Sequence, residues 1–169
     1  SVLDGPAVKI RRRYKWLIIN LGTAFMAAAV VGLFESTIAA VAILAAYMPV
    51  VAGMGGNAGT QSMAVTVRGI SLGQVSLATG KRVIANEAVA GAANGVITGA
   101  LVAVVATAFS YGEFGVLLGA VIGVSMVANL VIAGFFGALM PLTLDRLGVD
   151  PATSATIFIT TATDVLGFL

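Results

Sequence analysis

The sequence predicts an all-α integral membrane protein with five transmembrane helices. We expect the second helix to be broken by Pro and Gly, and the N-terminus to be cytoplasmic. Hydrophobic residues make up 59% of the 169 residues, 9% are charged, and the mean hydropathy is +1.07. Soluble domains carry about 25% charged residues and about half apolar residues. The apolar residues also form runs long enough to cross the hydrocarbon core, which takes about 20 residues per helix.

The first span follows a basic lead, residues 1–15, and runs from Trp16 to Phe34. A basic cluster before an apolar run is typical of a cytoplasmic juxtamembrane segment attracted to anionic headgroups. A cleaved signal peptide is the rival interpretation, but its apolar region covers only about 7–15 residues. The cations of this lead are Lys9, Arg11, Arg12, Arg13 and Lys15.

Four more spans follow, and together with the first they form one five-helix transmembrane domain over residues 16–169. At about 1.5 Å per residue, the fifth gets only halfway into the hydrocarbon core by Leu169. We therefore expect it to be cut short there and the sequence to be a fragment of a longer chain. The expected spans are Ile38–Val67, Val83–Phe109, Gly115–Leu144 and a fifth starting near Ala155.

The cations predict the orientation. With the N-terminus inside, all nine Lys and Arg residues fall in cytoplasmic segments. The outer connections, around Glu35 and from Ser110 to Phe114, hold none. This is the positive-inside pattern, and it favours a multi-pass protein of the cell membrane, such as a bacterial inner membrane, with a cytoplasmic N-terminus.

Glycines recur every four residues in the third and fourth spans. This spacing places each trio on one helix face, where another backbone can approach closely. We interpret both trios as packing surfaces of the scaffold. They are Gly91, Gly95 and Gly99, then Gly115, Gly119 and Gly123.

Asp164 is the one acid, of seven in the chain, that lies well inside a span. A carboxylate at mid-membrane costs about 2.5–3.5 kcal/mol on insertion scales and usually marks an ion pathway or a counter-ion. No Lys, Arg or His lies within any span to pair with it. A cation site is the functional interpretation. The structural alternative is a protonated Asp164 that bonds to the Thr160 hydroxyl or to an Asn of another helix.

The second span contains Pro49 and four glycines within residues 47–62. Pro removes a backbone donor and Gly permits non-helical dihedrals, so we expect a break that frees carbonyls at mid-membrane depth. Broken helices of this kind often form the ion site of transporters, although a kink that serves packing is the alternative. Asn57 and Gln61 lie four residues apart and offer amide oxygens on one face. Gly56 is a further candidate for the pore wall.

Other polar residues are less informative. Glu35 lies in the expected outer connection after the first span, where it could attract cations or simply be solvated. Asn20, Asn94 and Asn129 are amides within spans, for which interhelical hydrogen bonds are a more usual role than ion binding.

Cysteine and histidine are both absent. Their absence excludes thiolate nucleophiles, imidazole bases and the common zinc sites. The remaining oxygen ligands are those that hard cations such as Mg²⁺, Mn²⁺ and Ca²⁺ prefer. An intramembrane protease would need a His or Lys base, or two neighbouring acids, so an enzyme is not expected. A nucleic-acid partner is not expected either.

Several motifs together resemble the transmembrane domain of the MgtE family of magnesium channels and transporters. They occur in the family's order and cover roughly residues 16–169. The motifs are FES (34–36), PVVAGMGGNAGTQS (49–62), ANL (128–130), GALMP (137–141), RLGVDPA (146–152) and TATDVLG (161–167).

The resemblance implies a homodimer whose cation path runs along the dimer axis between the second and fifth helices. It also implies a central, largely hydrated Mg²⁺, with Mn²⁺ or another divalent cation as possible substitutes. Asp164 and Asn57 would contact the ion through side chains, and Gly53 and Thr160 through backbone carbonyls. A sparse site suits Mg²⁺, which gives up water reluctantly. Two alternatives stay open: an ion-coupled exporter of divalent cations, and a membrane scaffold without transport.

Overall fold

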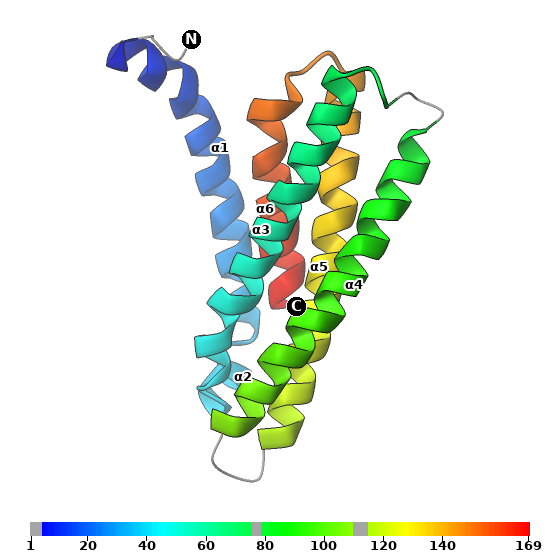
Figure 1. The fold of residues 1–169 in the computed structure, drawn as a ribbon. Helices are drawn as coiled ribbons and strands as arrows, with labels where there is room; N and C mark the ends of the chain where they lie inside the picture. The colour runs from blue at the N-terminus through cyan, green and yellow to red at the C-terminus, as the bar shows by residue number, and fades with distance from the viewer. Residues whose placement is uncertain (1–4, 76–78, 110–114) are drawn as a thin grey trace.

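The computed structural model describes residues 5–75, 79–109 and 115–169, and no strand occurs in this part of the chain. Six helices follow one another along the sequence (Figure 1). They are α1 (Pro6–Leu33), α2 (Glu35–Ala40), α3 (Leu44–Ser71), α4 (Gly80–Phe109), α5 (Gly115–Arg146) and α6 (Pro151–Phe168).

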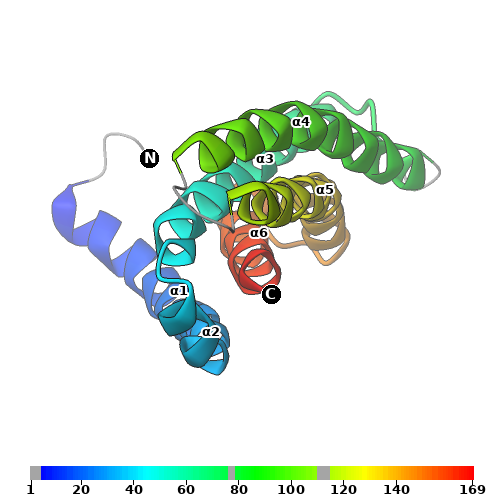
Figure 2. The ribbon, with the colours of Figure 1, turned by 90° about the horizontal axis from the view of Figure 1, so that it is seen from below.

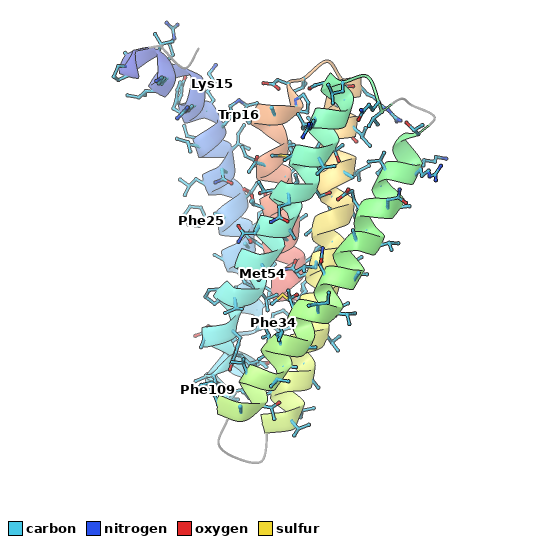
Figure 3. The ribbon with its side chains drawn as sticks, in the orientation of Figure 1. Lys15, Trp16, Phe25, Phe34, Met54 and Phe109 are labelled. Carbon is cyan, nitrogen blue, oxygen red and sulfur yellow. The ribbon has the colours of Figure 1, made fainter. Side chains whose placement is uncertain are left out.

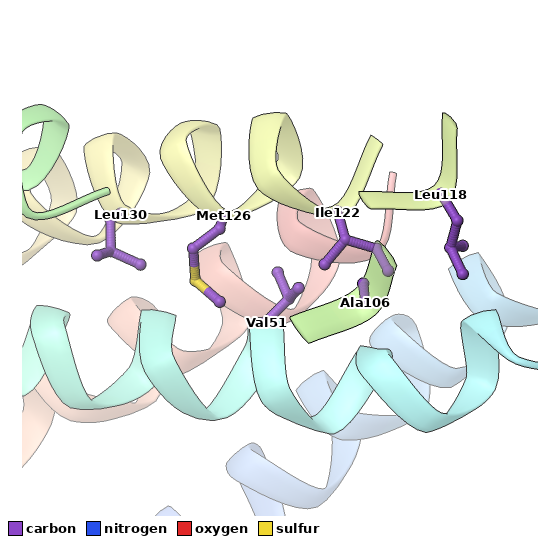
Figure 4. Packing of buried hydrophobic residues seen from close by; sticks show 6 residues of the cluster. All are labelled: Val51, Ala106, Leu118, Ile122, Met126 and Leu130. Carbon is purple, nitrogen blue, oxygen red and sulfur yellow. The ribbon is translucent and has the colours of Figure 1, made fainter. Parts of the chain in front are cut away.

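Helix α5 is the centre of the bundle. It packs along α4 and also contacts α3 and α6, and α1 joins the bundle through its contacts with α6. Seen along the helices, α5 and α6 lie between α4 on one side and α1 with α2 on the other (Figure 2). Met126, Leu130 and Ile122 of α5 form the main core with Val51 of α3 (Figure 4).

The long helices alternate in direction, which collects the basic residues at one end. The start of α1, the end of α3, the start of α4 and the end of α5 all lie at the upper end in Figure 1. Lys15 and Trp16 lie toward this end of α1, whereas Phe34 and Phe109 lie toward the other (Figure 3). Arg68, Lys81, Arg82 and Arg146 belong to the helix ends at the basic end. Within the described residues, the one-sided charge expected from the sequence is thus a feature of the fold; the expected outer connection from Ser110 to Phe114 lies outside them.

Three helices of the described part are long and apolar enough to cross a membrane: Arg13–Leu33, Gly80–Phe109 and Gly115–Arg146. Helix α6 contributes a shorter apolar stretch, Ser154–Phe168. Helix α3 falls outside this set because its glycines and amides lower its hydropathy. The sequence's first, third and fourth spans therefore correspond to helices of spanning length.

The glycine faces of α4 and α5 are packing surfaces, as expected. A Cβ added at Gly95 would lie 2.8 Å from the Val127 Cα, and one at Gly99 would lie 2.7 Å from the Gly123 carbonyl oxygen. Only a hydrogen at these positions lets the two backbones approach this closely. The close approach fixes α4 on α5 over most of their length.

The break expected at Pro49 and the glycines of the second span is not found. Helix α3 is continuous from Leu44 to Ser71, and the interruption comes earlier, between α2 and α3. Pro49 lies near the start of α3, where it removes only one helical hydrogen bond. The positive-φ glycines of the described residues are Gly73 and Gly148, with φ of 66° and 69°, in the turns that follow α3 and α5.

The helix ends also differ from the expected spans. Helix α1 begins at Pro6, inside the basic lead, and α6 begins at Pro151 rather than near Ala155. The Asp150 carboxylate caps α6 by accepting a hydrogen bond of 3.0 Å from the Ala152 N–H. Both helices begin with a proline, which favours the first helical position, and both therefore start before their apolar runs.

Candidate cation site

Helices α3 and α6 lie side by side and antiparallel. Gly59 of α3 packs directly against Ile159 of α6. One turn further along α3, Met63 accepts a 3.5 Å hydrogen bond at its sulfur from the Thr156 hydroxyl. Because both helices rise equally per residue, the same register places Asp164 at the height of Gly55.

Asp164 is half-buried in α6, and its carboxylate has no hydrogen bond or ion pair within the described part of the chain. The Thr160 hydroxyl, its expected partner in the structural alternative, donates instead to the Thr156 carbonyl at 2.9 Å. The amide of Asn129 donates elsewhere as well. Neither partner of the structural alternative therefore pairs with this carboxylate within the described residues.

Asn57 lies at almost the same height on α3, and its side chain is exposed. The helical path of α3 places Asn57 and Gln61 on neighbouring turns of one face, as the spacing of four predicts. No hydrogen bond joins Asn57 to Asp164 among the described residues. The chain thus brings the two predicted ligands to one level, but one copy alone does not close a site around them.

The two expected carbonyl ligands are both engaged in helices. Gly53 lies within α3, so its carbonyl belongs to the helical ladder, although the space beside its Cα is open. The Thr160 carbonyl also accepts a 3.1 Å bond from the Thr163 hydroxyl. To bind an ion, the oxygen of either carbonyl would have to accept its present hydrogen bond and contact the ion as well. This makes the two carbonyls weaker candidates for ion ligands than the side chains.

Gln61 and Glu35 are placed in other parts of the structure, and Gly56 offers a carbonyl that is already engaged. Gln61 lines a groove of about 180 Å³ between α3 and α4, together with Glu87 and Asn94. Glu35 is exposed at the start of α2, at the end of the bundle opposite the basic residues. The Gly56 carbonyl accepts a 2.8 Å bond from the Thr60 hydroxyl. These residues do not converge on one point within a single copy.

No cluster of three or more acids, within the described residues, could enclose a metal ion. A cation held beside Asp164 would meet one carboxylate of this chain and otherwise neutral oxygens. Such sparse coordination leaves most ligand positions to water, which is how Mg²⁺ is usually held.

Asn129 is a buried polar residue whose position between helices the sequence does not reveal. It is fully buried in α5 and donates a 2.9 Å hydrogen bond to the Val51 carbonyl of α3. The interhelical hydrogen bond expected of this amide is therefore confirmed.

Comparison with known proteins gives a consistent result. The MgtE family, described as a divalent cation transporter, matches residues 48–169. A magnesium transporter MgtE of Enterococcus faecalis is 33% identical over 169 residues, which are 100% of this chain and 37% of that protein. The Bacillus subtilis relative of the same name is 35% identical over 158 residues, 94% of this chain and 34% of its own length.

A third magnesium transporter MgtE, from Thermus thermophilus, is 34% identical over 165 residues, 98% of this chain and 36% of that protein. The chain thus spans about a third of the length of the curated relatives that it matches. The similarity covers the region that contains Asn57 and Asp164.

Proposed function

This chain belongs to the MgtE family of divalent cation transporters, and from that premise we propose that it passes Mg²⁺ across the cell membrane of a bacterium. The observation that carries the proposal is the carboxylate of Asp164, which lies in an apolar helix without a partner among the described residues. An acid in such a helix is costly unless a cation or a path requires it. The names of the relatives favour Mg²⁺ as that cation.

The proposed pathway forms between two copies of the chain. One Asp164 per copy gives a strongly charged site only where two copies meet, and a two-fold dimer brings identical faces together. Asn57, at the height of Asp164, then adds an amide from each copy. The ion keeps most of its water, because few protein oxygens are available and Mg²⁺ dehydrates reluctantly.

In this proposal all five long helices cross the membrane, α3 and α6 included, with the basic end in the cytoplasm. The polar face of α3 is then covered by the second copy rather than by lipid. The basic lead at the start of α1 lies beside anionic headgroups of the cytoplasmic leaflet, where each cation contributes about 1 kcal/mol of attraction.

Growth of a bacterium that lacks its own Mg²⁺ uptake tests the proposal. The chain should restore growth at low Mg²⁺, Asp164→Asn should not, and Asn57→Ala should restore it partly, since that change removes a neutral ligand. Equal rescue by Asp164→Asn, at equal expression, would remove the support for a cation path at this residue.

An ion-coupled exporter of divalent cations is the second candidate, because the same site could serve a carrier. The two are separated in a planar bilayer. Unitary currents indicate a channel, whereas small, saturating fluxes that depend on a proton or sodium gradient indicate a carrier. A scaffold without transport would produce neither.

A further inference from the structure

The side-chain amide of Asn129 carries an unsatisfied polar atom in the middle of the bundle. The residue has a relative exposure of 0%, and its Nδ2 donates to the Val51 carbonyl at 2.9 Å. Its Oδ1 is buried and has no hydrogen-bond partner among the described residues. A buried acceptor without a donor destabilises a fold. An amide at this place therefore needs a reason other than stability.

Glycines on two different helices make room for this amide. A Cβ at Gly167 of α6 would lie 2.8 Å from the Asn129 Nδ2 and 3.1 Å from its Oδ1. A Cβ at Gly55 of α3 would collide with the same amide. Asn129 thus fills the space between the backbones of α3 and α6 and contacts both.

These contacts lie next to the candidate cation site. Gly55 is two residues from both Gly53 and Asn57 on α3. Gly167 is three residues, or about one turn, from Asp164 on α6. A change in the size or shape of the amide would shift α3 relative to α6 at the height where the two predicted ligands lie.

We propose that Asn129 is a positioning residue for the cation path: its amide spaces α3 from α6 and so sets the distance between Asn57 and Asp164. The proposal rests on the proposed function and adds a residue that does not itself contact the ion. Residues that orient metal ligands typically change metal affinity or activity by about 10–100-fold when they are replaced. A residue that serves packing alone would instead change stability and transport together.

Two replacements approach the amide from different sides. Asn129→Leu keeps a branched side chain but removes the unpaired acceptor, and the Val51 carbonyl keeps its bond within α3. Gly167→Ala keeps the asparagine at position 129 and adds a methyl group on α6 that crowds its amide. Ser125→Ala is the matched control, because Ser125 lies one turn away on α5 and its hydroxyl donates only within that helix, to the Val121 carbonyl at 2.8 Å.

The assay uses the full chain in liposomes that contain a Mg²⁺-sensitive dye, together with melting curves recorded without Mg²⁺. Asn129→Leu should melt at or above the wild-type temperature, because a buried unpaired acceptor is gone. Its half-saturating Mg²⁺ concentration for uptake should nevertheless rise about tenfold. Gly167→Ala should raise this concentration as well, and Ser125→Ala should leave it unchanged.

Wild-type half-saturation in Gly167→Ala and in folded Asn129→Leu would overturn the positioning role. A parallel loss of melting temperature and uptake in both variants would also overturn it, in favour of packing alone. If Asn129→Leu does not fold, Gly167→Ala decides. Asp164→Asn in the same liposomes separates the two proposals, because wild-type uptake by Asp164→Asn refutes the proposed site itself.

Discussion

Replacing Asp164 by Asn removes a charge and changes the shape of the side chain very little. At about 4 Å and an effective dielectric near 20, two unit charges interact by about 4 kcal/mol, and in bulk water by about 1 kcal/mol. The charge of a divalent cation is twice as large, so its attraction to a half-buried carboxylate lies between about 2 and about 8 kcal/mol. Each copy therefore contributes several kcal/mol of gross attraction. Since 1.4 kcal/mol is a factor of about ten in affinity, the variant should not bind Mg²⁺ measurably at millimolar concentrations.

Mg²⁺-dependent thermal stability measures this loss directly. A single site at 100 times its Kd raises the free energy of unfolding by about 2.7 kcal/mol. For a chain of this size, 1 kcal/mol moves the melting temperature by about 2–4 °C. The wild-type protein should therefore melt about 5–11 °C higher at saturating Mg²⁺, and Asp164→Asn should show no rise.

Asp145→Asn is the control, because it makes the same chemical change at an exposed position near the end of α5. It should keep the full Mg²⁺ effect. A Mg²⁺-dependent rise in Asp164→Asn equal to that of the wild type would refute the reasoning, since the stabilising ion would then be bound elsewhere.

Three further predictions follow from the fold. These 169 residues contain no cysteine, so Ser36→Cys should react with an impermeant thiol reagent in intact cells and Ser71→Cys should not; the reverse pattern would contradict the cytoplasmic basic end. Thr60→Cys, on the exposed face of α3 near Asn57, should form disulfide-linked dimers in membranes, and a strictly monomeric product would contradict the two-copy path. Gly99→Val should destabilise the protein by about 1–3 kcal/mol through overpacking, whereas Gly22→Val, with open space beside it, should leave the melting temperature unchanged.

The sequence predicted the scaffold well where a pattern of residues allowed one physical interpretation. Glycines at intervals of four on α4 and α5 predicted close backbone contact, and Gly95 and Gly99 make it. The basic residues predicted a single basic end, and the alternating helix directions produce it.

The glycines of α3 were harder to interpret, because glycine permits both unusual dihedrals and close packing. The sequence suggested a broken helix, whereas Gly55 and Gly59 lie in a continuous helix and make room for Asn129 and Ile159. Their neighbours come from α5 and α6, far along the chain, so no local pattern could distinguish the two uses. For the same reason, the sequence predicted an interhelical hydrogen bond for Asn129 but not its place between α3 and α6.

The candidate site was predictable as a set of residue types but not as a geometry. Asp164 stood out because a lone acid in an apolar run is costly, and the register of α3 and α6 places Asn57 near its height. The proposed path between two copies would depend on a surface that the structure of one chain does not define. Gln61 shares a helix face with Asn57, but it lines the groove between α3 and α4, beside Glu87.

Mg²⁺ flux through the purified protein tests the central claim most directly. The chain is reconstituted into liposomes that contain a Mg²⁺-sensitive dye, and external Mg²⁺ is the only added divalent cation. The account predicts a dye signal well above that of protein-free liposomes for the wild-type chain and none for Asp164→Asn reconstituted at equal density. A folded wild-type protein without Mg²⁺ flux, or an equal flux through Asp164→Asn, would contradict it.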